Sequence, residues 1–315
     1  MFIFMDICIQ MYKYFSKFAP LLKKECYILF IFATNLFIMM KEKKYQVQVV
    51  TFSPTRTSSK IATQVSKGLG YGAVNFIEAT YLEPSKTTFT TDDIVLVIAP
   101  VYAGRVAKLA LERFKNLKGD HTPVIPIVVY GNRHYDDAWL ELNEFLAERG
   151  FVTLATGNFV GEHSYSSAEM PLAEGRPDQE DKQKAFIFGQ EIAQLINAFV
   201  RVSSDEQDLA QKIKAHAETL QVPGHKPYKP GMGGPKDICP EVDLSICTHC
   251  GKCVTACPNG VITLMDGIFT NDTVKCIQCM ACVKICPQGA RSFFTPVAEK
   301  LFNTCKERRE PEWLV

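Results

Sequence analysis

Twelve cysteines occur in this chain of 315 residues, and eight of them fall between Cys247 and Cys286. They form two identical runs of the type Cys-x-x-Cys-x-x-Cys-x-x-x-Cys-Pro, and the second run starts at Cys276, 29 residues after the first. The sequence therefore contains an internal duplication. Thiols crowded in this way, in a chain without a convincing secretory signal, indicate metal ligation in a reducing cytoplasm and not a disulfide framework.

The repeated run resembles that of bacterial two-cluster ferredoxins, in which the fourth cysteine of each run binds the other cluster. The resemblance implies two 4Fe-4S clusters with crossed ligands. The first cluster would be bound by Cys247, Cys250, Cys253 and Cys286, and the second by Cys276, Cys279, Cys282 and Cys257. A pair of zinc sites is the alternative, although zinc ribbons commonly use two separated Cys-x-x-Cys pairs. Cys239 and the other remaining cysteines are expected to be free thiols.

Upstream of the cysteines, the sequence pattern predicts strands and helices that would position a second binding site. Near-continuous apolar runs, typical of parallel strands buried on both faces, occupy residues 94–99, 124–130 and 151–156, with a first strand at 45–50 and a weaker one near 73–77. Apolar residues recur with helical spacing after Thr57 and over residues 106–117, 138–149 and 185–200. This alternation predicts a doubly wound α/β domain with a five-stranded parallel sheet.

Ligands of such a sheet bind beyond the carboxyl ends of its strands, where three loops carry suitable residues. The first loop is rich in hydroxyls and opens a helix, so it suits a phosphate, although a plain Ser/Thr helix cap is the alternative. The other two loops are aromatic and contain glycine, which suits a flat ring. The candidates are Ser53, Thr55, Arg56, Thr57 and Ser58 in the first loop, Pro100, Val101, Tyr102, Ala103 and Gly104 in the second, and Tyr130, Gly131, Asn132 and Tyr135 in the third.

These three loops resemble those of flavodoxins over about residues 45–200. The resemblance implies bound FMN, with its phosphate in the first loop and its ring between the other two. Flavodoxins usually have glycine where Arg56 stands, so the guanidinium either adds a charge contact to the phosphate or changes how the loop approaches it. Residues 161–165, Gly-Glu-His-Ser-Tyr, follow the fifth strand and could cover the flavin.

The domain organisation follows from these motifs. Residues 45–200 form the α/β domain, 201–238 a helix and a Pro/Gly linker, 239–291 the two-cluster domain, with a hairpin around 265–267, and 292–315 a C-terminal tail. Residues 1–44 contain an apolar run of 14 residues at 27–40, whereas a membrane span needs about 20. They are a non-native extension, a membrane-associated helix or a packed accessory helix, and any membrane association is expected to involve them alone.

The two predicted cofactors favour electron transfer. A cluster passes one electron at a time and a flavin holds one or two, so the fusion would link one-electron and two-electron redox partners in the cytoplasm, and it resembles electron-transfer proteins of anaerobic bacteria. The alternative is a flavin-dependent reductase of a small quinone or nitro compound, fed by its own clusters. We expect redox proteins as partners. A net charge of +1 gives no reason to expect nucleic acid.

Overall fold

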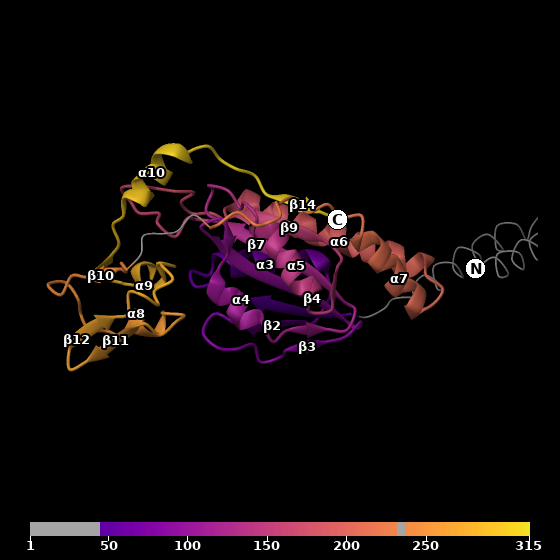
Figure 1. The fold of residues 1–315 in the computed structure, drawn as a ribbon, viewed down its shortest axis with the longest axis horizontal. Coiled ribbons are helices and arrows are strands. Elements are labelled where there is room, and N and C mark those ends of the chain that lie inside the picture. Colours follow the sequence, from indigo (N-terminus) through magenta and orange to yellow (C-terminus); the bar gives the residue numbers. More distant parts are fainter. Residues whose placement is uncertain (1–44, 232–236) are drawn as a thin grey trace, which may run out of the picture.

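The computed structural model describes residues 45–231 and 237–315 of the chain. The interpretations of residues 1–44 concern a segment outside this part. Within the described part, no helix is both long and apolar enough to cross a membrane. An α/β sandwich and a small cysteine-rich domain lie side by side (Figure 1).

The central sheet runs in the order β2-β1-β4-β7-β9 with all these strands parallel, and the short strand β8, Phe151–Thr153, also pairs with β7 in parallel, so the described sheet has one parallel strand more than predicted. The bounds of the other strands are Gln46–Thr51 for β1, Val74–Glu78 for β2, Asp93–Tyr102 for β4, Thr122–Tyr130 for β7 and Thr156–Val160 for β9. Strand β14, Glu312–Leu314, adds an antiparallel edge beside β9. The parallel order is that of flavodoxin-like doubly wound sheets, so the predicted fold class is confirmed.

The sequence predicted one strand over residues 151–156, and the structure divides this segment into β8, Phe151–Thr153, and β9. Both pair with β7, and the break lies opposite Pro126 of that strand. Proline has no N–H to donate to the ladder, and the Pro126 carbonyl accepts a hydrogen bond from the Thr156 hydroxyl at 2.8 Å. The last strand therefore ends at Val160, four residues later than predicted.

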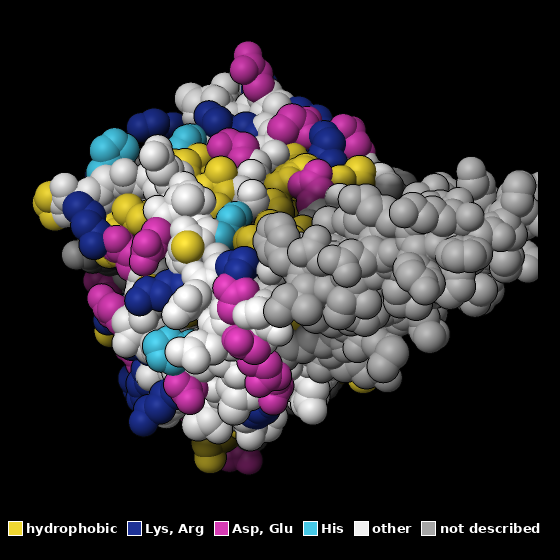
Figure 2. Space-filling model, turned by 90° about the vertical axis from the view of Figure 1, so that its right-hand side faces the viewer, with side chains coloured by type: hydrophobic (Ala, Val, Ile, Leu, Met, Phe, Trp, Pro, Cys, Tyr) yellow, Lys and Arg dark blue, Asp and Glu magenta, His cyan; other side chains and the backbone are white. Residues whose placement is uncertain are grey.

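Helices cover both faces of the sheet. They are α3, Thr57–Leu69, and α6, Gln179–Val202, on one face, α4, Lys108–Phe114, and α5, Ala138–Ala147, on the other, and α7, Glu206–Ala217, beyond the end of α6. Short strands β3, Thr88–Phe89, and β6, Lys118–Gly119, pair with each other, and β5, Arg105–Val106, pairs with β4. On the face shown in Figure 2, Lys and Arg are interspersed with Asp and Glu over the described surface.

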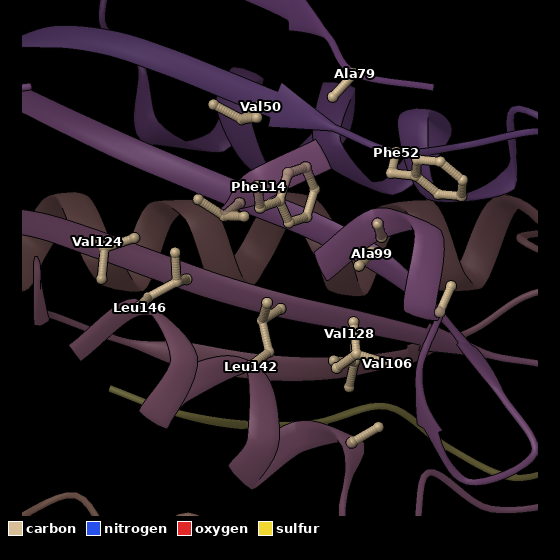
Figure 3. Close-up of a cluster of buried hydrophobic side chains, with 14 of the residues drawn as sticks. Val50, Phe52, Ala79, Ala99, Val106, Phe114, Val124, Val128, Leu142 and Leu146 are labelled. Atoms are coloured by element: carbon tan, nitrogen blue, oxygen red, sulfur yellow. The ribbon is translucent and has the colours of Figure 1, made fainter. Parts of the chain in front are cut away.

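Each face of the sheet has its own apolar core. One core packs Phe114, Leu142 and Leu146 of α4 and α5 against strand valines, as Figure 3 shows. The other packs α3 and α6 against the opposite face of the same strands. These two helices cross closely at Gly68 and Gly189, since a Cβ on Gly189 would lie 2.2 Å from the carbonyl oxygen of Val65. The two cores hold the strand ends, and the loops that follow them, in fixed positions.

The cysteine-rich domain repeats one backbone design. Its elements are β10, Glu241–Val242, α8, Lys252–Thr255, β11, Ile262–Met265, β12, Ile268–Asn271, α9, Ala281–Lys284, and β13, Arg291–Ser292. Strands β11 and β12 form the hairpin predicted around residues 265–267. Positive φ angles occur at His249 (55°) and Gly251 (69°) and again, 29 residues later, at Gln278 (53°) and Met280 (59°). The duplicated sequence thus folds into duplicated loops.

The chain returns to the α/β domain after the cysteine-rich domain. The sequence analysis assigned residues 292–315 to a tail, and the structure folds them into α10, Pro296–Thr304, and β14. Trp313 of β14 packs on Phe159 and Phe188 and donates from Nε1 to Glu191 at 2.6 Å. A strand of three residues carries too little alternation to be predicted from sequence. The cysteine-rich domain is therefore attached to the α/β domain on both its N-terminal and C-terminal sides.

Candidate functional site

Two cavities inside the cysteine-rich domain collect its eight clustered cysteines. The lining of the first cavity includes Cys247, Cys250, Cys253 and Cys286, and that of the second includes Cys257, Cys276, Cys279 and Cys282. In each cavity three cysteines come from one run and the fourth from the other, which is the crossed grouping that the resemblance to two-cluster ferredoxins implied. Cys239, which the sequence analysis left as a free thiol, also lines the second cavity.

The donor chemistry of both cavities fits iron–sulfur clusters. Among the described lining residues there is no histidine and no carboxylate, so thiols are the only strong metal ligands. Backbone N–H groups point at sulfur, from His249 to Cys247 Sγ at 3.4 Å and from Ala290 to Cys286 Sγ at 3.2 Å. Such hydrogen bonds favour the anionic thiolate, the form that binds metal.

The two cavities differ in electrostatics as well as in exposure. Burial raises the pKa of Cys279 and of Cys282 to about 12, so these thiols must lose their protons when metal binds. Burial also acts to raise the pKa of Cys286, but backbone N–H groups around it outweigh burial and lower that pKa below its ordinary value. Cys250 of the first set is exposed, whereas its counterpart in the second run, Cys279, is buried.

A third and larger cavity of about 440 Å³, here called the strand-end cavity, lies beyond the carboxyl ends of the parallel strands. Its volume falls in the usual range for small-molecule sites, about 300–1,000 Å³. Ten of the predicted residues line it: Ser53, Thr55, Thr57, Ser58, Pro100, Val101, Tyr102, Ala103, Tyr130 and Gly131. The three predicted loops therefore do converge on one site.

Four predicted residues lie elsewhere. Arg56 precedes α3 with φ of 62°, a left-handed conformation that glycine adopts at less cost. Gly104 packs against Asp136. Asn132 is buried and donates to the carbonyls of Cys305 and Glu307, both at 2.8 Å, and Tyr135 packs in the core and donates to Glu312 at 3.2 Å. Asn132 and Tyr135 thus hold the returning C-terminal segment and do not line the cavity.

The first loop provides the hydroxyls for an anion at the start of α3. The Thr55 and Thr57 hydroxyls are hydrogen-bonded to each other at 3.1 Å, while Ser53 Oγ accepts from the Ser59 N–H at 3.1 Å. Ser53 thus accepts from the first turn of α3, although the N-cap residue is Arg56 and makes no side-chain cap hydrogen bond, and the two threonines line the cavity beside the positive end of the helix dipole. A Cβ on Gly161 would lie 2.1 Å from Thr57 Cγ2, so the loop after β9 closes tightly over this end.

Aromatic side chains line the strand-end cavity as well, together with the charged side chains of Arg133, Glu162 and Lys300. Burial raises the pKa of Tyr102 well above its ordinary value, and the neighbouring Cys279 adds to that effect. His163 also lines the cavity, and burial, followed by the charges of Lys284 and Arg133, lowers its pKa to about 4. The imidazole is therefore neutral near pH 7. A flat, largely apolar ring with a phosphate tail fits this combination of hydroxyls and aromatic rings.

Parts of the chain far from the three loops complete the strand-end cavity. Ile277 and Gln278 of the cysteine-rich domain line it, as do Val297, Lys300, Leu301 and Thr304 of α10. The Tyr165 hydroxyl donates to Gln278 Oε1 at 2.9 Å, and the Tyr165 ring packs on Phe293 with centroids 5.3 Å apart. These walls could not be predicted from the sequence, because neither segment carries a motif of its own and only the tertiary fold brings them to the strand ends.

Comparison with known proteins identifies one segment of the chain by sequence. Residues 246–291 match the family model described as a 4Fe-4S dicluster domain, and no curated protein matches the chain. The described fold and the two groups of four thiols define the class: a flavodoxin-like α/β domain fused to a two-cluster ferredoxin domain. Its chemistry is therefore that of a redox protein that carries 4Fe-4S clusters.

Solved structures that resemble the chain do so over its α/β part. A flavodoxin described as from the domain Archaea is 13% identical, covers 47% of this chain and 96% of its own, and has a TM-score of 0.30. The two-electron reduced flavodoxin of Megasphaera elsdenii is 16% identical over 47% of this chain and 99% of its own, with a TM-score of 0.33. Rubredoxin oxygen:oxidoreductase from Desulfovibrio gigas is 13% identical over 51% of this chain and 38% of its own, with a TM-score of 0.34.

Proposed function

We propose that this chain passes electrons between its clusters and an FMN held in the strand-end cavity, in the order first cluster, second cluster, FMN. One observation carries the proposal. Ile277 and Gln278 line both the second cavity and the strand-end cavity. These two residues stand between the ligands Cys276 and Cys279, so a single layer of the chain separates the two sites.

The first cavity has the complementary position. Its ligand Cys250 is exposed, and the described residues that line it all belong to the cysteine-rich domain. A redox partner can therefore approach the first cluster from solvent, while the second cluster faces inward. We infer that one-electron protein partners, in the cytoplasm where thiols stay reduced, exchange electrons at the first cluster.

The chain's own residues would perform three tasks at the flavin. Thr55, Thr57 and Ser58 would bind the phosphate beside the start of α3, and Tyr102 and Tyr130 would contact the ring. Ile277 packs against the core of the α/β domain and excludes water from the boundary between the two sites. When bound, the clusters supply one-electron steps and the flavin supplies one-electron or two-electron steps.

Two matched variants test the order. Cys250→Ala and Cys279→Ala change equivalent positions in the two runs, so each should remove one cluster and leave the other. After rapid mixing with limiting dithionite under anaerobic conditions, the chain without the first cluster should still pass electrons from its remaining cluster to FMN within one molecule. The chain without the second cluster should lose that phase. Equal behaviour of the two variants would contradict the proposed order.

A further inference from the structure

Arg291 is a buried cation that has no carboxylate partner among the described residues. Arg291 is the first residue of β13 and is 3% exposed. The guanidinium donates from one nitrogen to the carbonyl of Pro240 at 3.2 Å and to Asn271 Oδ1 at 3.1 Å, both neutral acceptors. Its Nε and its other terminal nitrogen are buried and have no hydrogen-bond partner among the described residues.

The comparison with Arg176, another buried arginine, shows what is unusual. Arg176 is 5% exposed and makes a two-pronged ion pair with Asp181, with nitrogen–oxygen distances of 2.5 and 2.8 Å. Burying a charge without a counter-charge is costly, so buried arginines are normally paired in this way. Arg291 has no such pairing within the described part of the chain, so a negatively charged group bound by the cysteine-rich domain would supply it.

The position of Arg291 identifies that partner. Arg291 lines the first cavity together with its four cysteines, and its guanidinium lies 5.0 Å from the ring centroid of Phe269, which lines the same cavity. Its two acceptors, Pro240 and Asn271, line the second cavity. The side chain thus lies in the wall between the two cluster sites, and Arg291 belongs to the lining of the first cavity and not to that of the second.

The duplication provides an internal reference for this residue. The residue 29 positions earlier, equivalent to Arg291, is Ile262, which lines the second cavity. The two cavities therefore have the same four-thiol set but differ at this position, where one has a cation and the other an aliphatic side chain.

We propose that Arg291 is the buried counter-charge of the first cluster and raises its reduction potential relative to that of the second. Gaining an electron makes a cluster more negative, and a fixed positive charge nearby stabilises that reduced form. The electron goes to the cluster and no proton moves, because arginine stays charged throughout the working pH range. The proposal rests on cluster binding but not on transfer to FMN.

The test is a redox titration of the first cluster in the full chain. The Cys279→Ala background is used so that the first cluster is observed alone, and FMN is left out, so that failure of the path to flavin cannot affect the result. Arg291→Ile installs the residue of the other repeat, and Arg291→Lys keeps the charge. We expect Arg291→Ile to shift the reduction equilibrium about tenfold towards the oxidised cluster, equivalent to about 59 mV, and Arg291→Lys to shift it much less.

Each other outcome also decides the question. An unchanged potential in Arg291→Ile would overturn the proposal, as would equal shifts in the isoleucine and lysine variants, because shape and not charge would then matter. If Arg291→Ile fails to hold the cluster, iron content is compared with that of Arg291→Lys and Arg291→Gln. Loading by the lysine variant alone supports a counter-charge, and failure of all three overturns it.

Discussion

The first and second cluster cavities are built from two copies of the same cysteine run, yet their surroundings differ. Cys250 is exposed and Cys279 is buried, although they occupy equivalent positions. The difference arises from the residues between the ligands, since Thr248 and His249 in the first run correspond to Ile277 and Gln278 in the second. Duplication thus provides two sites of the same kind, and a few substitutions direct one to solvent and the other to the α/β domain.

The largest effect is expected when the fourth cysteine of a run is replaced, because this cysteine should bind the cluster of the other cavity. Cys257→Ala should remove the cluster of the second cavity, although Cys257 belongs to the first run, and iron should fall from about eight to about four per chain. The variant is made together with Cys239→Ala, because Cys239 also lines the second cavity. Cys286→Ala with Cys239→Ala is the matched control and should remove the first cluster. Spectra that assign the losses the other way round would refute the crossed grouping.

The second effect is expected at the start of α3, where hydroxyls line the strand-end cavity. Thr55→Ala with Thr57→Ala removes two hydroxyls that line it. A hydrogen bond to a charged group contributes about 1.5–3 kcal/mol, so the loss of even one such bond should lower the affinity for FMN about tenfold to a hundredfold. Riboflavin, which lacks the phosphate, should lose much less. Fluorescence titration with both ligands checks this, and equal losses would mean that the loop does not contact phosphate.

The third effect is a pH dependence from His163. Its pKa is lowered to about 4 in the folded chain, against about 6.5 in an unfolded one. Between these two pKa values the unfolded state therefore binds more protons than the folded state. The contribution of the neutral His163 side chain to the free energy of unfolding is fully present above about pH 6.5 and is lost as the pH falls towards about 4. The loss is of the order of 1–3 kcal/mol. Denaturant unfolding at several pH values should show this slope in the parent chain and a flatter one in His163→Gln.

The smallest effect is expected at the hydrogen bond between Tyr165 of the α/β domain and Gln278 of the second cysteine run. Tyr165→Phe removes the hydroxyl that donates to Gln278 Oε1 at 2.9 Å. The free energy of unfolding should fall by about 1 kcal/mol, the usual net value of such a bond. Tyr81→Phe, at a tyrosine that is 41% exposed, serves as the control. Should both variants unfold at the same denaturant concentration, the Tyr165 contact would not help to hold the two domains together.

The sequence predicted the local features well and the walls of the strand-end cavity poorly. The resemblance of the cysteine runs to those of two-cluster ferredoxins indicated both groups of four, and the loops after three strands indicated ten lining residues, because strand ends of a parallel sheet meet at one edge. The return of α10 and the approach of Ile277 could not be predicted, since they depend on how two domains pack. Asn132 and Tyr135 follow a strand that ends at the cavity, but they bind the C-terminal segment instead.

The proposed electron path lies inside one molecule, and the rate of flavin reduction at different protein concentrations tests whether it does. The fully loaded chain is mixed rapidly with limiting reductant, and cluster and flavin absorbance are followed at two concentrations that differ tenfold. Because Ile277 and Gln278 line both sites, transfer from clusters to FMN should have the same rate constant at both concentrations. A rate that rises in proportion to protein concentration would contradict the proposed path and leave two independent carriers on one chain.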